Sequence, residues 1–341
     1  MRREEDKMNF EIQNRRYLGS KFKLIDWIVE LVKENTSGNS FLDLFSGTGI
    51  VTKAFLNYFD EFIINDFLYS NNIIYKAFFS DEPYSKEKLL HLKNQYNSVI
   101  QNNLDDDYFV NNYGGKYFSN HDARKIGEIR EMIAQDESIN EHEKSILLAS
   151  LLYSTDRIAN TVGHYDAYRK KSHIDDRFVF NLISPINTKN KDISIYREDA
   201  NELAKHVKAD VAFIDPPYNS RQYSRFYHVL EEIIKWDKPK LSGVAMKPPV
   251  ENMSDYSKSS APQVFEDLIH NLNVKYIVVT YNNTYKSKSN SSKNKISHEE
   301  ILNTLNSVGE TKVFNKSFRY FNAGKTNLNN HREYLFITKV G

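Results

Sequence analysis

The chain has 341 residues, and its 46 Lys and Arg residues against 45 Asp and Glu residues give a formal net charge of +1 at pH 7. This balance excludes a disordered polyelectrolyte and a uniformly basic protein that coats nucleic acid. The net charge by itself does not indicate a binding partner. The absence of cysteine excludes disulfides, thiolate metal sites and cysteine nucleophiles. Because one ordinary domain takes roughly 100–200 residues, we expect a large catalytic domain with an insertion, or two domains.

The N-terminal segment is charged and carries no apolar core of a signal peptide. No run of the sequence approaches the ~20 apolar residues that a membrane-spanning helix needs. A chain without cysteine also suits a reducing compartment. We therefore expect a cytoplasmic protein with no membrane partner.

The first predicted elements alternate between helix and strand. Apolar residues at helical spacing from Lys23 to Val32 predict a helix, and the apolar run Phe41–Phe45 predicts a strand. A glycine turn follows, then a helical stretch from Ile50 to Tyr58, then a second strand, Glu61–Asp66, that ends on an acid. This order is typical of the first half of a doubly wound α/β sheet, in which ligands bind at the carboxyl ends of the strands.

From about Phe67 to Tyr196 the pattern becomes mainly helical, as in Lys125–Ile133 and Glu143–Tyr153. Strand patterns return at residues 192–196, 210–215, 274–280 and 333–338. We therefore predict an α/β fold with a Rossmann-like sheet that a mainly helical insertion interrupts. The predicted boundaries are 10–66 and 192–341 for the sheet domain and 67–191 for the insertion.

The glycine turn after the first strand carries Gly47 and Gly49, which let the backbone approach a ligand closely at the start of a helix. Asp66 follows Gly49 by 17 residues, about where a doubly wound fold places a carboxylate for ribose hydroxyls. The pair favours an adenosine-containing ligand, although a glycine-rich connection that serves only folding is the alternative. Because Ile50, Val51 and Thr52 follow Gly49, the dinucleotide fingerprint is incomplete, and a nicotinamide cofactor is disfavoured.

The tetrapeptide Asp215-Pro216-Pro217-Tyr218 follows the apolar strand Val211–Phe213. It places a carboxylate, two fixed φ angles and an exposed aromatic ring at a strand's carboxyl end. Asp215 and the Pro216 carbonyl can accept the two hydrogens of an exocyclic amino group, and Tyr218 offers a stacking face for a planar base. The alternative is a strand-stop signal followed by a core tyrosine.

These motifs, in this order and preceded by Arg16–Lys21, resemble those of the Dam-like, alpha-group adenine-specific DNA N(6)-methyltransferases, which use S-adenosyl-L-methionine. Further matches at Ala159–Tyr165, Asn219–Tyr223 and Glu333–Phe336 resemble enzymes of the FokI type. The resemblance covers most of the chain, from about Arg15 to Lys339. It implies an S-adenosylmethionine-dependent methyltransferase sheet and a target-recognition role for the helical insertion.

The resemblance also implies which residues bind the cofactor. Asp43, Phe45, Gly47 and Gly49 would line its methionine end, and Asp66 would hold the ribose. The contact to its adenine amine would be Asp199, with the adjacent Glu198 as the alternative. The full expected cofactor set is Tyr17, Lys21, Asp43, Phe45, Gly47, Gly49, Asp66 and Asp199.

The implied catalytic residues are Asp215, Pro216, Pro217 and Tyr218. The adenine amine is a poor nucleophile because its lone pair is delocalised into the ring, and two acceptors would draw it toward a tetrahedral geometry and stabilise its developing positive charge. Since a stacked base is inaccessible, the target adenine would be flipped out and placed against Tyr218.

Contact with DNA phosphates must come from local basic clusters, because the net charge is near zero. The first candidate cluster is Arg169, Lys170 and Lys171, and the second is Arg221, Tyr223 and Arg225, with Tyr227 interleaved. A solvated basic face is the alternative for each. His164, His173 and His228 suit no common zinc spacing, so we expect no metal.

The expected function is methylation of adenine in a short, specific double-stranded DNA sequence, within a restriction-modification system that pairs the enzyme with a separate cognate restriction endonuclease. One alternative keeps the chemistry and changes the substrate to RNA. Another is a catalytically silent nucleic-acid-binding module of the same fold, which the intact Asp215–Tyr218 tetrapeptide argues against.

Overall fold

The computed structural model describes residues 10–98, 107–170, 173–283, 293–317 and 331–341. The chain divides into two compact units. One unit consists of Met1–Gly19, Leu68–Lys189 and Ser224–Glu251, and the other of Ser20–Phe67, Asn190–Tyr223 and Asn252–Gly341. We call them the helical unit and the sheet unit.

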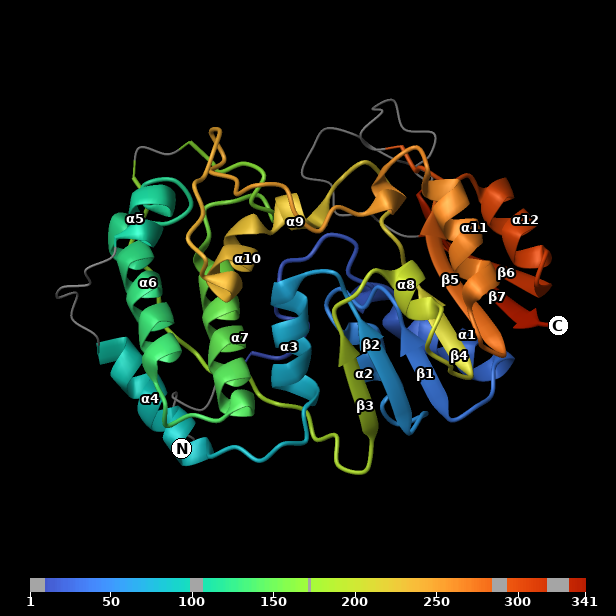
Figure 1. Ribbon diagram of the computed structural model, residues 1–341, viewed down its shortest axis with the longest axis horizontal. Coiled ribbons are helices and arrows are strands. Elements are labelled where there is room, and N and C mark those ends of the chain that lie inside the picture. The colour runs from blue at the N-terminus through green and yellow to red at the C-terminus, as the bar shows by residue number, and fades with distance from the viewer. Residues whose placement is uncertain (1–9, 99–106, 171–172, 284–292, 318–330) are drawn as a thin grey trace. The chain divides into compact units, whose positions relative to one another are not determined.

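The described strands of the sheet unit form one seven-stranded sheet in the order β3-β2-β1-β4-β5-β7-β6 (Figure 1). β1 to β5 run parallel to one another, whereas β7 is antiparallel to β5 and to β6. The strands are β1 Ser40–Asp43, β2 Glu61–Asn65, β3 Asp192–Tyr196, β4 Val211–Ile214, β5 Tyr276–Asn282, β6 Gly309–Ser317 and β7 Arg332–Val340. The predicted α/β sheet is confirmed, and β6 is an additional strand that the sequence reading missed.

Helices cover both faces of this sheet. They are α1 Ile25–Asn35, α2 Ile50–Phe55, α8 Ala200–Ala204, α11 Ala261–Asn271 and α12 His298–Asn306, with 3-10 turns at Phe22–Leu24 and Asp255–Ser257. Side chains alternate between the two faces of a strand. Accordingly Leu42 packs in one core with α8, α11 and α12, whereas the neighbouring Phe41 packs against Phe55 of α2.

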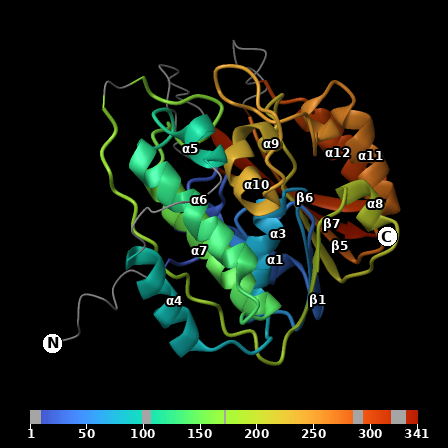
Figure 2. The same ribbon diagram turned by 60° about the vertical axis from the view of Figure 1, so that its left-hand side comes forward.

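The helical unit contains most of the predicted insertion. Its helices are α3 Tyr69–Phe79, α4 Lys86–Ser98, α5 Tyr108–Tyr113, α6 Asn120–Gln135, α7 Glu141–Ile158 and α10 His228–Lys235, while α9 Tyr223–Phe226 crosses the boundary between the units. The long helices α6 and α7 pack against each other (Figure 2). Residues 10–19 and 224–251 also group with these helices, so the compact units follow a different division from the predicted boundaries. The assignment of target recognition to 67–191 stays a prediction.

The segment after the Asp215–Tyr218 tetrapeptide forms two helices and not one, because α9 ends at Phe226 and α10 begins only at His228. Trp236 ends α10 in the left-handed conformation, with φ of 55°. Among the helices of the described ranges, none has the length and apolar character that crossing a membrane requires.

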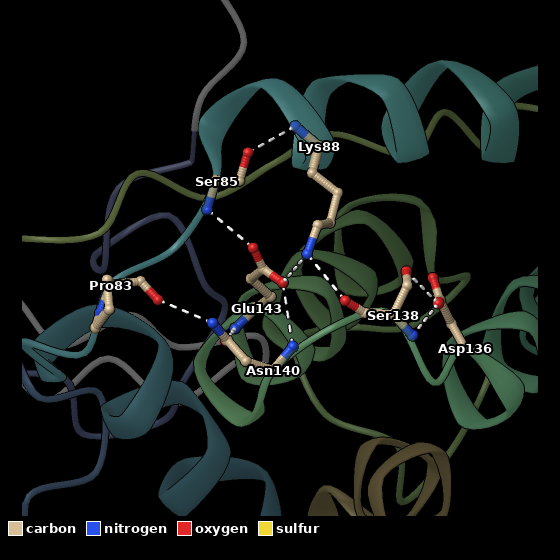
Figure 3. Close-up of polar contacts among 7 residues, drawn as sticks. All are labelled: Pro83, Ser85, Lys88, Asp136, Ser138, Asn140 and Glu143. Atoms are coloured by element: carbon tan, nitrogen blue, oxygen red, sulfur yellow. Dashed lines mark hydrogen bonds and ion pairs between the residues drawn. The ribbon is translucent and has the colours of Figure 1, made fainter.

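A buried carboxylate ties the start of α7 to the start of α4 in the helical unit (Figure 3). Glu143 accepts hydrogen bonds from the backbone N–H groups of Ser85 at 2.9 Å and Asn140 at 3.1 Å, and from the Lys88 ammonium at 2.8 Å. The Asn140 side chain in turn accepts from the Glu143 N–H, which completes a capping box. Burial would raise the pKa of Glu143, but these hydrogen bonds outweigh it and lower the pKa below the usual 4.5.

We expect Glu143→Ala to lower the free energy of unfolding at pH 7 by about 2–4 kcal/mol, because the N–H groups of Ser85 and Asn140 and the Lys88 ammonium lose their acceptor. A carboxyl group with a depressed pKa stabilises the fold above its unfolded-state value and loses this contribution as the pH falls through the folded-state value. The difference between wild type and variant should therefore shrink below pH 4.5. Urea unfolding of wild type and variant at pH 7 and pH 4 measures this difference in the free energy of unfolding. Glu141→Ala, at an exposed neighbour, is the control. Equal midpoints for the Glu143 variant and wild type at pH 7 would contradict this account.

Candidate active site

The centre of the sheet brings two sequence motifs together. β1 and β4 are neighbouring parallel strands, and the chain order of the sheet reverses between them. Ligands of such sheets bind outside the carboxyl ends of the strands at this reversal. The glycine turn follows β1 and the Asp215–Tyr218 tetrapeptide follows β4, so both lie at this edge.

The glycine turn requires glycine at both predicted positions. Gly47 has φ of 52° and Gly49 has φ of 74°, in the left-handed region that side chains disfavour. The Gly49 N–H donates to the Ser46 carbonyl at 2.7 Å, and Gly49 caps the start of α2. Asp66, after β2, accepts the Gly47 N–H at 3.0 Å. The turn and the acid expected to act together are thus in direct contact.

Asp43 and Phe45 lie on the same turn. The Asp43 side chain is buried, and its carboxylate accepts the Thr52 hydroxyl of α2 at 2.7 Å. Burial raises the pKa of Asp43 to about 7, against the lowering effect of the hydrogen bond from Thr52. The Phe45 ring is half-buried, edge to face with Tyr256 at 5.1 Å between ring centroids.

Asp215 lies in a dense polar cluster, which we call the Lys21 cluster and which comprises Lys21, Asp215, Tyr218, Thr280 and Glu333. The Lys21 ammonium lies 2.8 Å from Asp215 Oδ2 and 3.3 Å from Glu333 Oε1. The Thr280 hydroxyl donates to Asp215 Oδ1 at 2.8 Å, and the Tyr218 hydroxyl also contacts this oxygen. Lys21 donates to the Tyr218 hydroxyl at 2.6 Å, and this hydroxyl lies 3.2 Å from Glu333 Oε1.

Burial and charge act together in this cluster. Burial lowers the pKa of Lys21, but Asp215 and Glu333 raise it more, so that it lies above its usual value. Burial raises the pKa of Glu333, against the lowering effect of Lys21. Burial, with Asp215 and Glu333 adding to it, also raises the pKa of the Tyr218 phenol. Lys21 therefore stays an ammonium and Tyr218 a neutral phenol at physiological pH.

Tyr218 differs from the sequence expectation of an exposed ring. The ring is half-buried, packs edge to face with Tyr281 at 4.8 Å between centroids, and lies 4.9 Å from the Lys21 ammonium. The expectation was wrong on this point because the tetrapeptide turns back onto the sheet edge, where the Tyr218 hydroxyl finds three polar partners. Pro216, beside it, is buried.

Asp199 and Glu198 follow β3. Asp199 is exposed and caps α8, since its Oδ1 accepts the N–H groups of Asn201 at 2.9 Å and Glu202 at 3.3 Å. Glu198 is fixed through its backbone, which exchanges hydrogen bonds with the Asn65 side chain, and its carboxylate lies 3.4 Å from His206. The choice between these two acids for the cofactor's adenine stays a prediction.

Tyr17 belongs to the helical unit, whereas Lys21 belongs to the sheet unit. The Tyr17 ring stacks on Tyr227 at 4.9 Å with an interplanar angle of 8°, and the Arg15 guanidinium lies 5.1 Å from its centroid. Its hydroxyl accepts from Asn71 at 3.4 Å. Tyr17 therefore has a packing role within the helical unit, and its cofactor contact stays a prediction.

The basic residues expected to meet DNA differ in exposure. Arg169 and Lys170 are exposed in the helical unit, and Lys171 lies outside the described residues. Arg221 and Tyr223 are half-buried in the sheet unit. Arg225, in the helical unit, donates from its guanidinium to the Pro248 carbonyl at 2.6 Å, and burial lowers its pKa.

Tyr227 was wrongly included among the candidate DNA contacts. Its ring is fully buried under Tyr17, and its hydroxyl accepts the Leu18 N–H at 2.9 Å. Alternation of basic and aromatic residues suggested a surface, but the turn between α9 and α10 directs this ring into the core.

Thr280 and Glu333 are members of the Lys21 cluster that received no role from the sequence. β5 and β7 pair antiparallel with Asn282 opposite Glu333, so Glu333 and Thr280 lie diagonally on one face of the sheet. Asp43 lies on the same face, opposite to that of Leu42. In the sequence, Thr280 and Glu333 are recognisable as polar residues within two otherwise apolar strands. That they lie close together follows only from the register in which β5 pairs with β7.

One histidine, His121, belongs to a group of possible metal ligands in the described part of the chain, whereas His228 does not. His228 is buried between Tyr113 and Tyr117, and burial lowers its pKa to about 3. In the described ranges, one group of candidate ligands comes within 4.8 Å, namely His121, Asp122 and Asp176. Both Asp122 oxygens already accept backbone N–H groups, from Arg177 and Phe178, so we assign no ion to it.

Comparison with known proteins agrees with this arrangement. The family model of D12 class N6 adenine-specific DNA methyltransferases matches residues 17–289. Modification methylase LlaI of Lactococcus lactis subsp. lactis is 34% identical over 79% of this chain and 46% of its own length. Type II methyltransferase M.FokI of Planomicrobium okeanokoites is 33% identical over 94% of this chain and 52% of its own length.

The chain thus spans about half the length of these two relatives. It matches Type II methyltransferase M.NlaIII of Neisseria lactamica over 98% of that protein's length, at 30% identity over 94% of this chain. The family match covers the glycine turn, the Asp215–Tyr218 tetrapeptide and Lys21. The chain belongs to the D12 class of N6 adenine-specific DNA methyltransferases.

Proposed function

We propose that this chain transfers the methyl group of S-adenosyl-L-methionine to the N6 amino group of an adenine in a short, specific double-stranded DNA sequence. The observation that carries the proposal is the Asp215 carboxylate, held by Lys21 and Thr280 at the sheet edge beside the glycine turn. The relatives named above are a modification methylase and two Type II methyltransferases. We therefore place the reaction in a restriction-modification system with a separate cognate endonuclease.

The residues around the glycine turn fit the proposed cofactor. The left-handed glycines open the backbone to a ligand, while Asp66 and Asp43 supply oxygens beside it. Such a donor set suits ribose hydroxyls and a cationic sulfonium, and Phe45 adds an apolar surface. When bound, S-adenosylmethionine supplies an electrophilic methyl group on its sulfur.

Asp215 and the Pro216 carbonyl act on the target amine. Each accepts one N–H of the adenine amino group, which fixes the nitrogen and directs its lone pair away from both acceptors. The Asp215 carboxylate would stabilise the positive charge that the amine nitrogen takes on as its bond to the methyl carbon forms and the methyl–sulfur bond of the cofactor breaks, which leaves a neutral thioether. The nitrogen would then lose one proton to solvent to reach the neutral product, and no strong base is needed because its acidity rises on methylation.

Tyr218 holds the base. Its hydroxyl is fixed by Lys21, so its ring orientation is set before the substrate arrives. The ring packs edge to face with Tyr281, and we assign its remaining surface to stacking with the flipped adenine.

Tritium transfer from labelled S-adenosylmethionine tests the proposal directly. We expect label in duplex DNA that carries the specific sequence and none in RNA of the same sequence. Label in RNA alone would replace the proposal with an RNA methyltransferase. Binding of nucleic acid without any label would indicate a silent binding module.

Arg169 and Lys170 are proposed to contact DNA phosphates, because both are exposed. We expect the double variant Arg169→Gln and Lys170→Gln to weaken duplex binding and to reduce the slope of log K against log salt concentration by about 2, one for each lost phosphate contact. A salt titration of binding measures this. Lys86→Gln, at an exposed lysine of α4, is the matched control. An unchanged slope in the double variant would show that these residues do not touch phosphate.

A further inference from the structure

Lys21 is shared by two carboxylates, and only one of them belongs to the catalytic tetrapeptide. Its ammonium lies 2.8 Å from Asp215 and 3.3 Å from Glu333, and the side chains of Lys21 and Glu333 are each 5% exposed. Asp215, at 17%, is the most exposed of the three charged side chains. Asp215 is thus the member that a substrate can reach, whereas Glu333 lies behind it, on β7.

The net charge of Lys21, Asp215 and Glu333 determines the electrostatic field at the substrate amine. Lys21 with Asp215 alone would form a neutral ion pair, and a buried pair offers little field to a third group. Burial raises the pKa of Glu333, but the Lys21 ammonium at 3.3 Å and the Tyr218 hydroxyl favour its carboxylate form. With both carboxylates ionised, the trio carries one net negative charge. Because water is largely excluded, this excess charge acts with less screening than it would at the surface.

We propose that Glu333 is a positioning residue that neutralises Lys21, so that the charge of Asp215 stays available to the amine of the substrate. This inference rests on the proposed function, in which the amine nitrogen becomes positively charged. Glu333 touches no reacting atom and acts through Lys21 and through the Tyr218 hydroxyl, which lies 3.2 Å from Glu333 Oε1.

Tyr218 gives a second reason for two carboxylates. Its hydroxyl has one proton and two carboxylate neighbours, Asp215 and Glu333, while its oxygen accepts from Lys21. When the Asp215 oxygens turn to the substrate amine, Glu333 can take the phenol proton as its hydrogen-bond partner. The tyrosine therefore keeps its orientation through the reaction.

The test is a double-mutant cycle of Lys21→Met and Glu333→Gln, measured as kcat and as binding of cofactor and duplex. We expect Glu333→Gln alone to lower kcat by about 10-fold to 100-fold, with both dissociation constants within about 2-fold of wild type. In the Lys21→Met background the same change should cost less than about 3-fold, because the charge that Glu333 neutralises is gone. Glu333→Asp, which keeps the charge, should restore part of the lost kcat.

Four outcomes would overturn the inference. A Glu333→Gln variant with wild-type kcat would remove the role, and an equal loss in both backgrounds would show that Glu333 does not act through Lys21. A loss of kcat that follows a fall in the thermal unfolding midpoint, with no recovery in Glu333→Asp, would indicate a folding role instead. Absence of methyl transfer by the wild type overturns the proposed function and this inference together, whereas wild-type transfer beside an unaffected variant overturns the inference alone.

Discussion

Asp215→Ala is expected to lower methyl transfer by at least about 10³-fold, because it removes the acceptor that orients the amine and stabilises its developing charge. The Pro216 carbonyl alone cannot supply a negative charge. Among the described residues, the side chains that hold the Asp215 carboxylate are those of Lys21, Tyr218 and Thr280, which belong neither to the glycine turn nor to the exposed basic residues. Dissociation constants for S-adenosylmethionine and for duplex DNA should therefore change much less than kcat.

The Asp215 variants need a control for folding, since removal of the carboxylate takes away one of the two acidic groups that hold Lys21 among the described residues. Asp215→Asn keeps the shape of the side chain and an acceptor for Thr280, so it should remain folded and be nearly inactive. Thermal unfolding measured beside single-turnover transfer separates the two effects. Wild-type turnover by a folded Asp215→Ala protein would contradict the proposed mechanism.

Tyr218→Ala is expected to lower kcat by about 10²-fold, with a further weakening of binding to duplex DNA. Stacking of a base on an aromatic ring is worth about 1–3 kcal/mol, and orientation of the amine is lost with it. Tyr218→Phe keeps the ring and removes only the hydroxyl. It should therefore lose activity far less than Tyr218→Ala, although Lys21 loses one acceptor.

The comparison of these two variants decides what Tyr218 does. A purely structural tyrosine predicts that thermal stability falls in the Ala variant while the activity of the folded fraction is unchanged. Fluorescence of 2-aminopurine placed at the target position adds a direct view of base stacking. Equal fluorescence for wild type and Tyr218→Ala would contradict a stacking role.

The parts of the fold that local sequence patterns determine were predicted well. β1, β2 and β3 lie where apolar runs of the sequence are followed by turn residues. The glycine turn after β1 has the left-handed φ angles that its two glycines suggested. β6 was missed because Gly309–Ser317 is mostly polar and exposed, as suits a strand that lies beside β7 at the edge of the described sheet.

The parts that depend on tertiary pairing were not predictable from one sequence. Glu333 and Thr280 join Asp215 only through the antiparallel pairing of β5 with β7, and no local pattern specifies that register. Tyr227 was misjudged for the same reason, since its burial depends on Tyr17, far away in the chain. Lys21 was found as a candidate, but its ion pair with Asp215 became visible only in the folded sheet unit.

Single-molecule sequencing of DNA from a host that expresses this chain tests the central claim most directly, because it identifies the modified base and its position together. The host should lack other adenine methyltransferases, and the Asp215→Ala protein should be expressed at the same level as a control. We predict N6-methyladenine at one short sequence in the wild-type sample and none in the control. Unmodified DNA, methylation of another base, or equal methylation in the Asp215→Ala sample would contradict the account.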